Sequence, residues 1–224
     1  FRRVLFRSRA RSVFASIDIH NNTGRNPLYG CITRLDRDSL NLAALFGRTT
    51  VYFRTPLGVQ TAAFAGLAPS ITVECGRPDS EPGVTRAAEL VDACLHLEHF
   101  PAHAPAAGDL DLFHTVAVVK VPEDVSFAFG EGSAPIVFPA GLDRMNFREL
   151  APDTCMADFG PGARLDVRDE AGNAVFDTFF CVREGRLMTR RTLMPAMLTL
   201  DAAVVRQDCL CYLMERLDPA AARG

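Results

Sequence analysis

The chain has 224 residues, of which 48% are hydrophobic and 23% are charged, and its formal net charge is −3. This composition is ordinary for a globular protein: the slightly acidic balance gives no electrostatic reason to expect nucleic acid as a partner, and no stretch approaches the ~20 apolar residues of a membrane-spanning helix. Seven cysteines, an odd number placed mostly within apolar runs, favour reduced thiols and a cytoplasmic protein.

The first residues, FRRVLFRS, have a basic flank but lack the continuous apolar core and the small-residue cleavage site of a signal peptide. They resemble a translated sequencing adaptor instead. We therefore expect residues 1–11 to be a non-native, sequencing-derived leader. We also expect the protein to be a fragment that is truncated on its N-terminal side.

Residues 12–100 alternate between strand and helix patterns. Apolar or β-branched runs predict strands over 12–20, 28–35, 49–54 and 70–75. Capping residues and helical apolar spacing predict helices over 36–47, 58–68 and 83–100. This order predicts an α/β domain over 12–100, in which helices flank a mainly parallel or mixed sheet.

The pattern changes at 101–109, PAHAPAAGD, where Pro, Ala and Gly replace the periodic spacing, so we place a linker there. Beyond it, short β segments are separated by turns at 112–121, 125–129, 135–138, 163–169 and 174–191. We therefore expect a small β-rich C-terminal domain over 110–224. Residues 208–217 are apolar without a clear period, and they predict neither a helix nor a strand.

Two of the predicted strands end on polar side chains that could carry chemistry. IDIHNN places His20 at a strand end with Asp18 two residues earlier, on the same face because side chains alternate along a strand. ITVECG places Glu74 at the end of an otherwise apolar strand, where an unpaired carboxylate is costly to bury. Because ligands bind beyond the carboxyl ends of strands in open α/β sheets, both ends are candidate site positions.

These two stretches resemble the zinc carboxypeptidase superfamily, and within it the aspartoacylase and succinylglutamate desuccinylase branch. DIHNNT resembles the segment that supplies the third zinc ligand in that family, and TVECGRPDSEPGVTRAAEL resembles the segment that carries its catalytic Glu. The two stretches occur in the family's order, and the resemblance covers residues 12–100 best.

The resemblance implies that His20 is a zinc ligand and that Glu74 is the catalytic general base and acid. It also implies that Asn21 contacts the substrate, whereas a supporting role for Asp18, holding the His20 ring, is suggested by its spacing alone. The family's other two zinc ligands lie on an upstream His-x-x-Glu motif, and no such motif precedes His20 here. We therefore expect the fragment by itself to be inactive.

The resulting hypothesis is a zinc-dependent hydrolase that cleaves an amide bond, an N-acyl amino acid deacylase whose substrate is a small acyl amino acid. One alternative is a metallocarboxypeptidase that acts on peptides, and another is a noncatalytic α/β module that binds a ligand or a partner. A rival metal site over His96, His99 and His103 competes with a solvated helix end as the explanation of those histidines.

Overall fold

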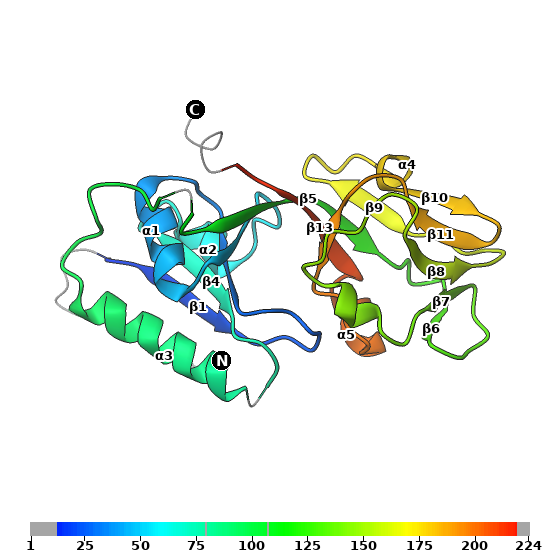
Figure 1. Ribbon diagram of the computed structural model, residues 1–224, viewed down its shortest axis with the longest axis horizontal. Helices are drawn as coiled ribbons and strands as arrows, with labels where there is room; N and C mark the ends of the chain where they lie inside the picture. The colour runs from blue at the N-terminus through cyan, green and yellow to red at the C-terminus, as the bar shows by residue number, and fades with distance from the viewer. Residues whose placement is uncertain (1–12, 79, 107, 219–224) are drawn as a thin grey trace.

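The computed structural model describes residues 13–78, 80–106 and 108–218, so the leader predicted at 1–11 lies outside the described residues. The described chain forms two lobes, each built on a sheet (Figure 1). The main sheet has eight strands, which are β1 (Ser16–His20), β4 (Ser70–Glu74), β2 (Tyr29–Ile32), β3 (Thr49–Tyr52), β5 (Asp111–Lys120), β13 (Cys211–Arg216) and β12 (Met194–Ala196) in spatial order, with β9 (Asp166–Asp169) paired to β5.

The main sheet is mixed, as the sequence predicted. β1 runs parallel to β4, and β3 runs parallel to both β2 and β5, whereas β2 is antiparallel to β4. The C-terminal strand β13 is antiparallel to β5 and to β12. The α/β class with flanking helices is thereby confirmed.

Helices lie on both faces of this sheet. α1 (Arg37–Phe46) and α3 (Glu81–His96) bury residues in the same core cluster as Ile71 and Val73 of β4. α2 (Gln60–Phe64) lies on the opposite face, where the Thr61 and Thr72 hydroxyls are hydrogen-bonded at 2.5 Å. Successive side chains of β4 point to opposite faces of the sheet, so Ile71 and Val73 face α1 and α3 whereas Thr72 faces α2. No helix in the described residues is long and apolar enough to cross a membrane.

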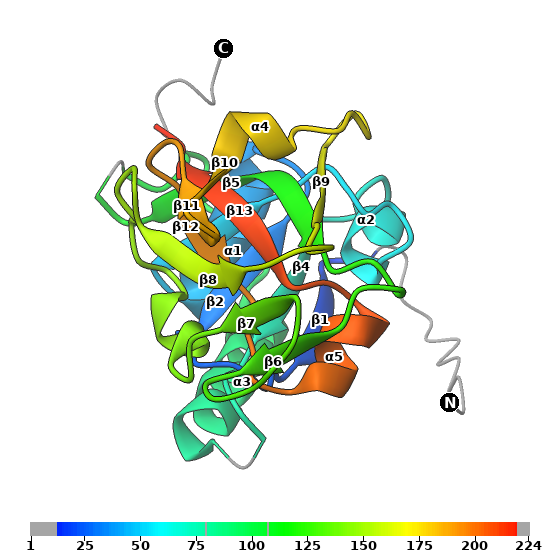
Figure 2. The ribbon, with the colours of Figure 1, turned by 90° about the vertical axis from the view of Figure 1, so that its right-hand side faces the viewer.

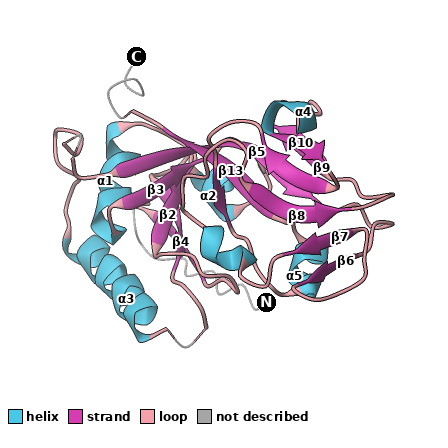
Figure 3. Ribbon diagram, turned by 45° about the vertical axis from the view of Figure 1, so that its right-hand side comes forward, coloured by secondary structure: helices cyan, strands magenta, loops and turns pink. Residues whose placement is uncertain are grey.

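The second lobe is rich in β-structure, and it lies on the right of Figure 1 and Figure 3. Its five-stranded sheet has the order β10 (Phe180–Arg183), β11 (Arg186–Thr189), β8 (Cys155–Phe159), β7 (Ile136–Phe138) and β6 (Phe127–Phe129). The lobe also contains the short helices η1 (Leu142–Met145), α4 (Phe176–Phe179) and α5 (Ala202–Gln207). Figure 2 looks onto this lobe with β6, β7 and β8 toward the viewer.

Two local expectations need correction or completion. The segment 174–191 was expected to be β throughout, but its residues Phe176–Phe179 form the helical turn α4 before the strands β10 and β11. The segment 208–217, for which the sequence made no prediction, supplies β13, which lies between β5 and β12 in the main sheet. Strand β13 is buried on both faces over much of its length, so its residues need not alternate in polarity.

Of the linker predicted at 101–109, the described residues 101–106 and 108–109 lie in the loop between α3 and β5. The main sheet nevertheless continues past it, because β5 pairs with β3 over Thr49–Tyr52. The long strand β5 then carries the chain into the second lobe, and β13 returns alongside it. The division into residues 12–100 and 110–224 stays a prediction, but the two parts share one sheet.

Candidate active site

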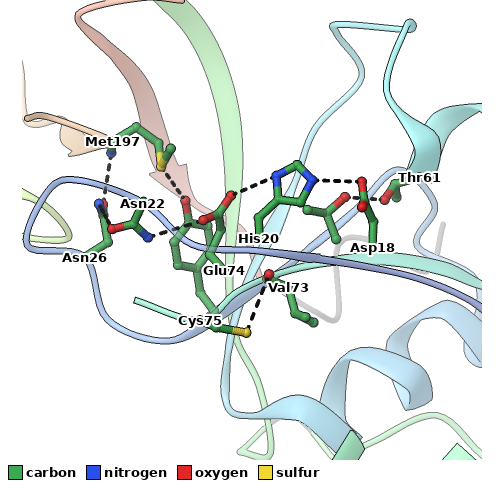
Figure 4. Close-up of polar contacts among 11 residues, drawn as sticks. Asp18, His20, Asn22, Asn26, Thr61, Val73, Glu74, Cys75 and Met197 are labelled. Atoms are coloured by element: carbon green, nitrogen blue, oxygen red, sulfur yellow. Dashed lines mark hydrogen bonds and ion pairs between the residues drawn. The ribbon is translucent and has the colours of Figure 1, made fainter. Parts of the chain in front are cut away.

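His20 and Glu74 lie directly opposite each other at the ends of the parallel strands β1 and β4. The Nδ1 atom of His20 is 3.9 Å from Oε1 of Glu74, and Figure 4 shows the two side chains facing each other. The two side chains point to the same face of the sheet because their residues are register partners. Two residues that are 54 positions apart in the sequence therefore meet at one sheet edge, beyond which ligands bind in folds of this kind.

Asp18 completes this group on the His20 side. It lies two residues before His20 on β1, and its Oδ2 atom is 3.1 Å from Nε2 of His20. The imidazole therefore lies between two carboxylates, one at each ring nitrogen (Figure 4). A carboxylate at one nitrogen fixes the orientation of the ring and favours a proton on that nitrogen.

Glu74 is the buried member of the group, with only 8% of its side chain exposed, whereas the His20 side chain is 50% exposed. Burial raises the pKa of the Glu74 carboxyl above its usual value. The hydrogen bond from Asn22 and the nearby His20 act in the opposite direction, but burial is the larger effect. A carboxylate whose pKa is shifted toward neutrality is suited to exchange protons with a substrate.

A chain of amides joins Glu74 to the segment that follows β12. Nδ2 of Asn22 donates to Oε2 of Glu74 at 3.3 Å, and Nδ2 of Asn26 donates to Oδ1 of Asn22 at 3.2 Å. Oδ1 of Asn26 in turn accepts the backbone N–H of Met197 at 3.0 Å. Residues 22–26 thus connect the candidate base to the C-terminal part of the chain (Figure 4).

The loop 22–26 also packs closely against this segment. A Cβ atom added to Gly24 would lie 2.0 Å from the carbonyl oxygen of Leu198, so only glycine permits this approach. The hydroxyls of Thr23 and Thr199 are hydrogen-bonded at 2.8 Å. Steric fit and hydrogen bonds therefore fix the loop that follows His20.

A buried carboxylate of the second lobe contacts the loops that follow both strands. Asp143 in η1 has a nearly fully buried side chain, and its Oδ2 atom is 3.4 Å from Nε of Arg25 and 3.6 Å from an Nη atom of Arg77. Arg25 follows His20 by five residues, and Arg77 follows Glu74 by three. Asp143 thus connects both loops to the second lobe.

Of the residues selected from the sequence, the structure brings together Asp18, His20 and Glu74. Asn21 is exposed and has no hydrogen-bond partner among the described residues, so its assignment to the substrate stays a prediction. The buried neighbour Asn22 was missed, although it is the residue that contacts Glu74. The alternation of Asp18 and His20 continues to Asn22, and this signal could have identified it.

The described residues do not by themselves fit a zinc ion. A catalytic zinc usually has three protein ligands, but no group of three His, Cys, Asp or Glu residues in the described ranges could hold a metal. This also applies to the rival histidine cluster. Nδ1 of His96 contacts the carbonyl oxygen of Asp92 at 2.8 Å at the exposed end of α3. This contact within the helix agrees with the interpretation of these histidines as a solvated helix end.

No family model and no curated protein matches this sequence. Solved structures do match it by fold. The succinylglutamate desuccinylase/aspartoacylase from Rhodobacter sphaeroides has a TM-score of 0.54 at 14% identity, over 91% of this chain and 58% of that one. Murine aminoacylase 3 has a TM-score of 0.51 at 12% identity, over 93% of this chain and 64% of that one.

A third structure, succinylglutamate desuccinylase from Vibrio parahaemolyticus, has a TM-score of 0.50 at 10% identity, over 91% of this chain and 54% of that one. The chain therefore spans between about half and two thirds of the length of these proteins. They include structures of the aspartoacylase and succinylglutamate desuccinylase branch, which is the branch that DIHNNT and TVECGRPDSEPGVTRAAEL resemble. The chain has the fold of the succinylglutamate desuccinylase and aspartoacylase structures.

Proposed function

We propose that the chain is the part of a zinc-dependent N-acyl amino acid deacylase that carries the general base. The observation that carries this proposal is the pairing of His20 with the buried Glu74 across β1 and β4. The named activities of the proteins that share the fold, a desuccinylase/aspartoacylase and an aminoacylase, support the same reaction class, which is hydrolysis of an amide bond between an acyl group and an amino acid.

In this proposal, Glu74 is the proton carrier. It takes a proton from the water that attacks the amide carbonyl carbon, and it gives that proton to the departing amine. Its raised pKa favours both steps, since a carboxyl with a pKa nearer neutrality holds the proton long enough to deliver it. Asn22 holds the carboxylate in place through its second oxygen.

Zinc is part of the proposal, and His20 would supply one of its ligands. The described residues do not provide a set of three zinc ligands. The other two ligands would therefore come from outside them, from a His-x-x-Glu motif like that of the family. Asp18 would hold the ring through one nitrogen, which leaves the other for the metal. Asn21, exposed beside His20, would contact the substrate.

The test begins with the genomic sequence that precedes residue 12. The proposal predicts a His-x-x-Glu motif there, and a protein extended to include it should hydrolyse N-acyl amino acids when zinc is supplied. Glu74→Gln should retain zinc but lower kcat by ~10²–10⁴-fold, the range expected for loss of a general base. Glu131→Gln, an exposed Glu in the second lobe, is the matched control and should keep full activity.

Three results would contradict the proposal. A start codon close to residue 12 with no upstream motif would favour a noncatalytic binding module. Release of C-terminal residues from peptides, without turnover of acyl amino acids, would favour the carboxypeptidase alternative. Unchanged turnover in Glu74→Gln would remove Glu74 from the reaction.

A further inference from the structure

Two arginines from the loops that follow β1 and β4 converge on one buried carboxylate oxygen of the second lobe. Nε of Arg25 is 3.4 Å and an Nη atom of Arg77 is 3.6 Å from Oδ2 of Asp143, whose side chain is only 3% exposed. In the described residues Asp143 has no other ion-pair partner. Because a carboxylate is costly to bury without partners, Asp143 draws both loops to the same point.

The charge of Asp143 also separates two groups that would otherwise repel each other. Both guanidinium groups contact the same carboxylate oxygen, so the two positive charges lie close together. Like charges at short range repel, and the carboxylate offsets this repulsion because it attracts both. Loss of the negative charge would therefore push the loop after β1 away from the loop after β4.

Asn22 lies where these two loops meet. Its backbone N–H donates to the carbonyl oxygen of Gly76, the residue before Arg77, at 2.9 Å. Its side-chain amide donates to the Glu74 carboxylate at 3.3 Å, which is long for a hydrogen bond of this kind. Because this bond is already long, a small separation of the two loops is enough to break it.

The turn that carries Asp143 also fixes the 22–26 loop by a second route. Asn146, the residue after η1, is buried, and its side-chain amide makes two hydrogen bonds of 2.8 Å with the backbone of Leu198. Gly24 packs against the carbonyl oxygen of that same residue. The second lobe thus contacts the loop through one charged pair and one steric fit, and only the charged pair can be removed without a change of shape.

We propose that Asp143 is a positioning residue for Glu74, acting through the two loops rather than by direct contact. Its charge holds the two arginines together, and this keeps Asn22 within hydrogen-bond distance of the Glu74 carboxylate. The second lobe thereby helps to orient the candidate base, although Asp18, His20 and Glu74 all belong to the first lobe. The inference rests on the proposed function for the part that Glu74 plays in the reaction.

The side-chain amide of Asn22 tests the proposal on the 224-residue chain. Asp143→Asn removes the charge and keeps the shape, and it should shift the NMR signals of this amide toward those of an exposed amide. The amide protons should also exchange with water about tenfold faster, as expected for the loss of one hydrogen bond. Asp124→Asn is the matched control, because Asp124 pairs with Arg164 on the exposed surface of the second lobe, and it should leave the Asn22 signals unchanged.

A second substitution should reverse the effect of the first. Arg77→Gln, added to Asp143→Asn, removes the repulsion between the two arginines, so the double variant should recover much of the native Asn22 signal. It should also fold where the single variant does not. Native Asn22 signals in Asp143→Asn, or an equal change in the Asp124→Asn control, would overturn the proposal. So would a double variant that behaves as the single one does.

Kinetics of the extended protein separate this proposal from the proposed function. Asp143→Asn should lower kcat and leave KM nearly unchanged, because it displaces Glu74 and not the substrate. Added to Asn22→Ala, it should lower kcat no further, since the contact through which it acts is already lost. Additive losses, or a native kcat, would overturn this proposal and leave the deacylase proposal standing. No turnover by the native extended protein, combined with the expected Asn22 signals, would contradict the deacylase activity and support the role of Asp143.

Discussion

The side-chain amide of Asn22 donates a hydrogen bond to the carboxylate of Glu74, which lies 52 residues later in the chain. Both groups are buried, and Asn22 is in turn held by Asn26. The position of the candidate base is therefore determined jointly by β4, which carries it, and by the loop after β1, which contacts it. Substitutions in that loop should alter the ionisation of Glu74 without touching it.

Asn22→Ala tests this relationship directly. The hydrogen bond from Asn22 lowers the pKa of Glu74, so its loss should raise that pKa further. The variant should also lose ~1–3 kcal/mol of unfolding free energy, the usual cost of an unsatisfied buried polar group. NMR titration of the Glu74 carboxyl and urea unfolding measure the two effects. Asn21→Ala, at the exposed neighbouring position, should change neither, and equal effects in both variants would contradict the assignment.

Glu74→Gln should change the pH dependence of stability. Because the pKa of Glu74 is raised in the folded state, that state binds more protons than the unfolded state between the two pKa values. The stability of the native protein therefore falls as pH rises from the usual Glu range through the folded pKa. The glutamine variant does not lose stability in this way, so its stability relative to the native protein should rise as pH increases from the usual Glu range through the raised pKa of Glu74, as urea unfolding at several pH values can measure. Glu131→Gln should show no such trend, and a constant difference for Glu74→Gln would mean that the pKa is not raised.

Gly24→Ala should destabilise the protein by ~1–3 kcal/mol, as overpacking of a tight contact does. The reason is the carbonyl oxygen of Leu198, which the new methyl group would approach to 2.0 Å unless the loop moved. Gly66→Ala is the matched control, since nothing lies within 4 Å of its added Cβ atom. Thermal unfolding measures the melting temperature of both variants. Equal melting temperatures would contradict the prediction and show that the loop can move to accept the methyl group without loss of stability.

Zinc uptake by the 224-residue chain should be weak. The described residues offer the zinc ion one imidazole at the site and no set of three ligands. Equilibrium dialysis should find no tight stoichiometric zinc, and any weak uptake should fall in His20→Ala and persist in His96→Ala. Tight zinc that survives His20→Ala and is lost in His96→Ala would instead locate the metal at the end of α3.

Much of the local structure could be predicted from the sequence. The alternation in SIDIH predicted a strand that presents Asp18 and His20 on one face, and the apolar run that ends in Glu74 predicted a buried strand. The cap at Asp36 and the apolar spacing after it predicted α1, where the Asp36 side chain accepts the N–H of Ser39 at 3.0 Å. These features depend on neighbouring residues, so a short window contains the information.

The tertiary structure alone decided which of these elements meet. Register pairing of β1 with β4 placed His20 opposite Glu74, and the approach of residues 197–199 placed Asn22 and Asn26 where they support that carboxylate. The place of β13 between β5 and β12 was equally hidden, because a strand buried on both faces has no polar alternation to reveal it. Contacts between distant segments depend on the packing of the whole chain, whereas the polarity pattern of a segment reports only how that segment is buried.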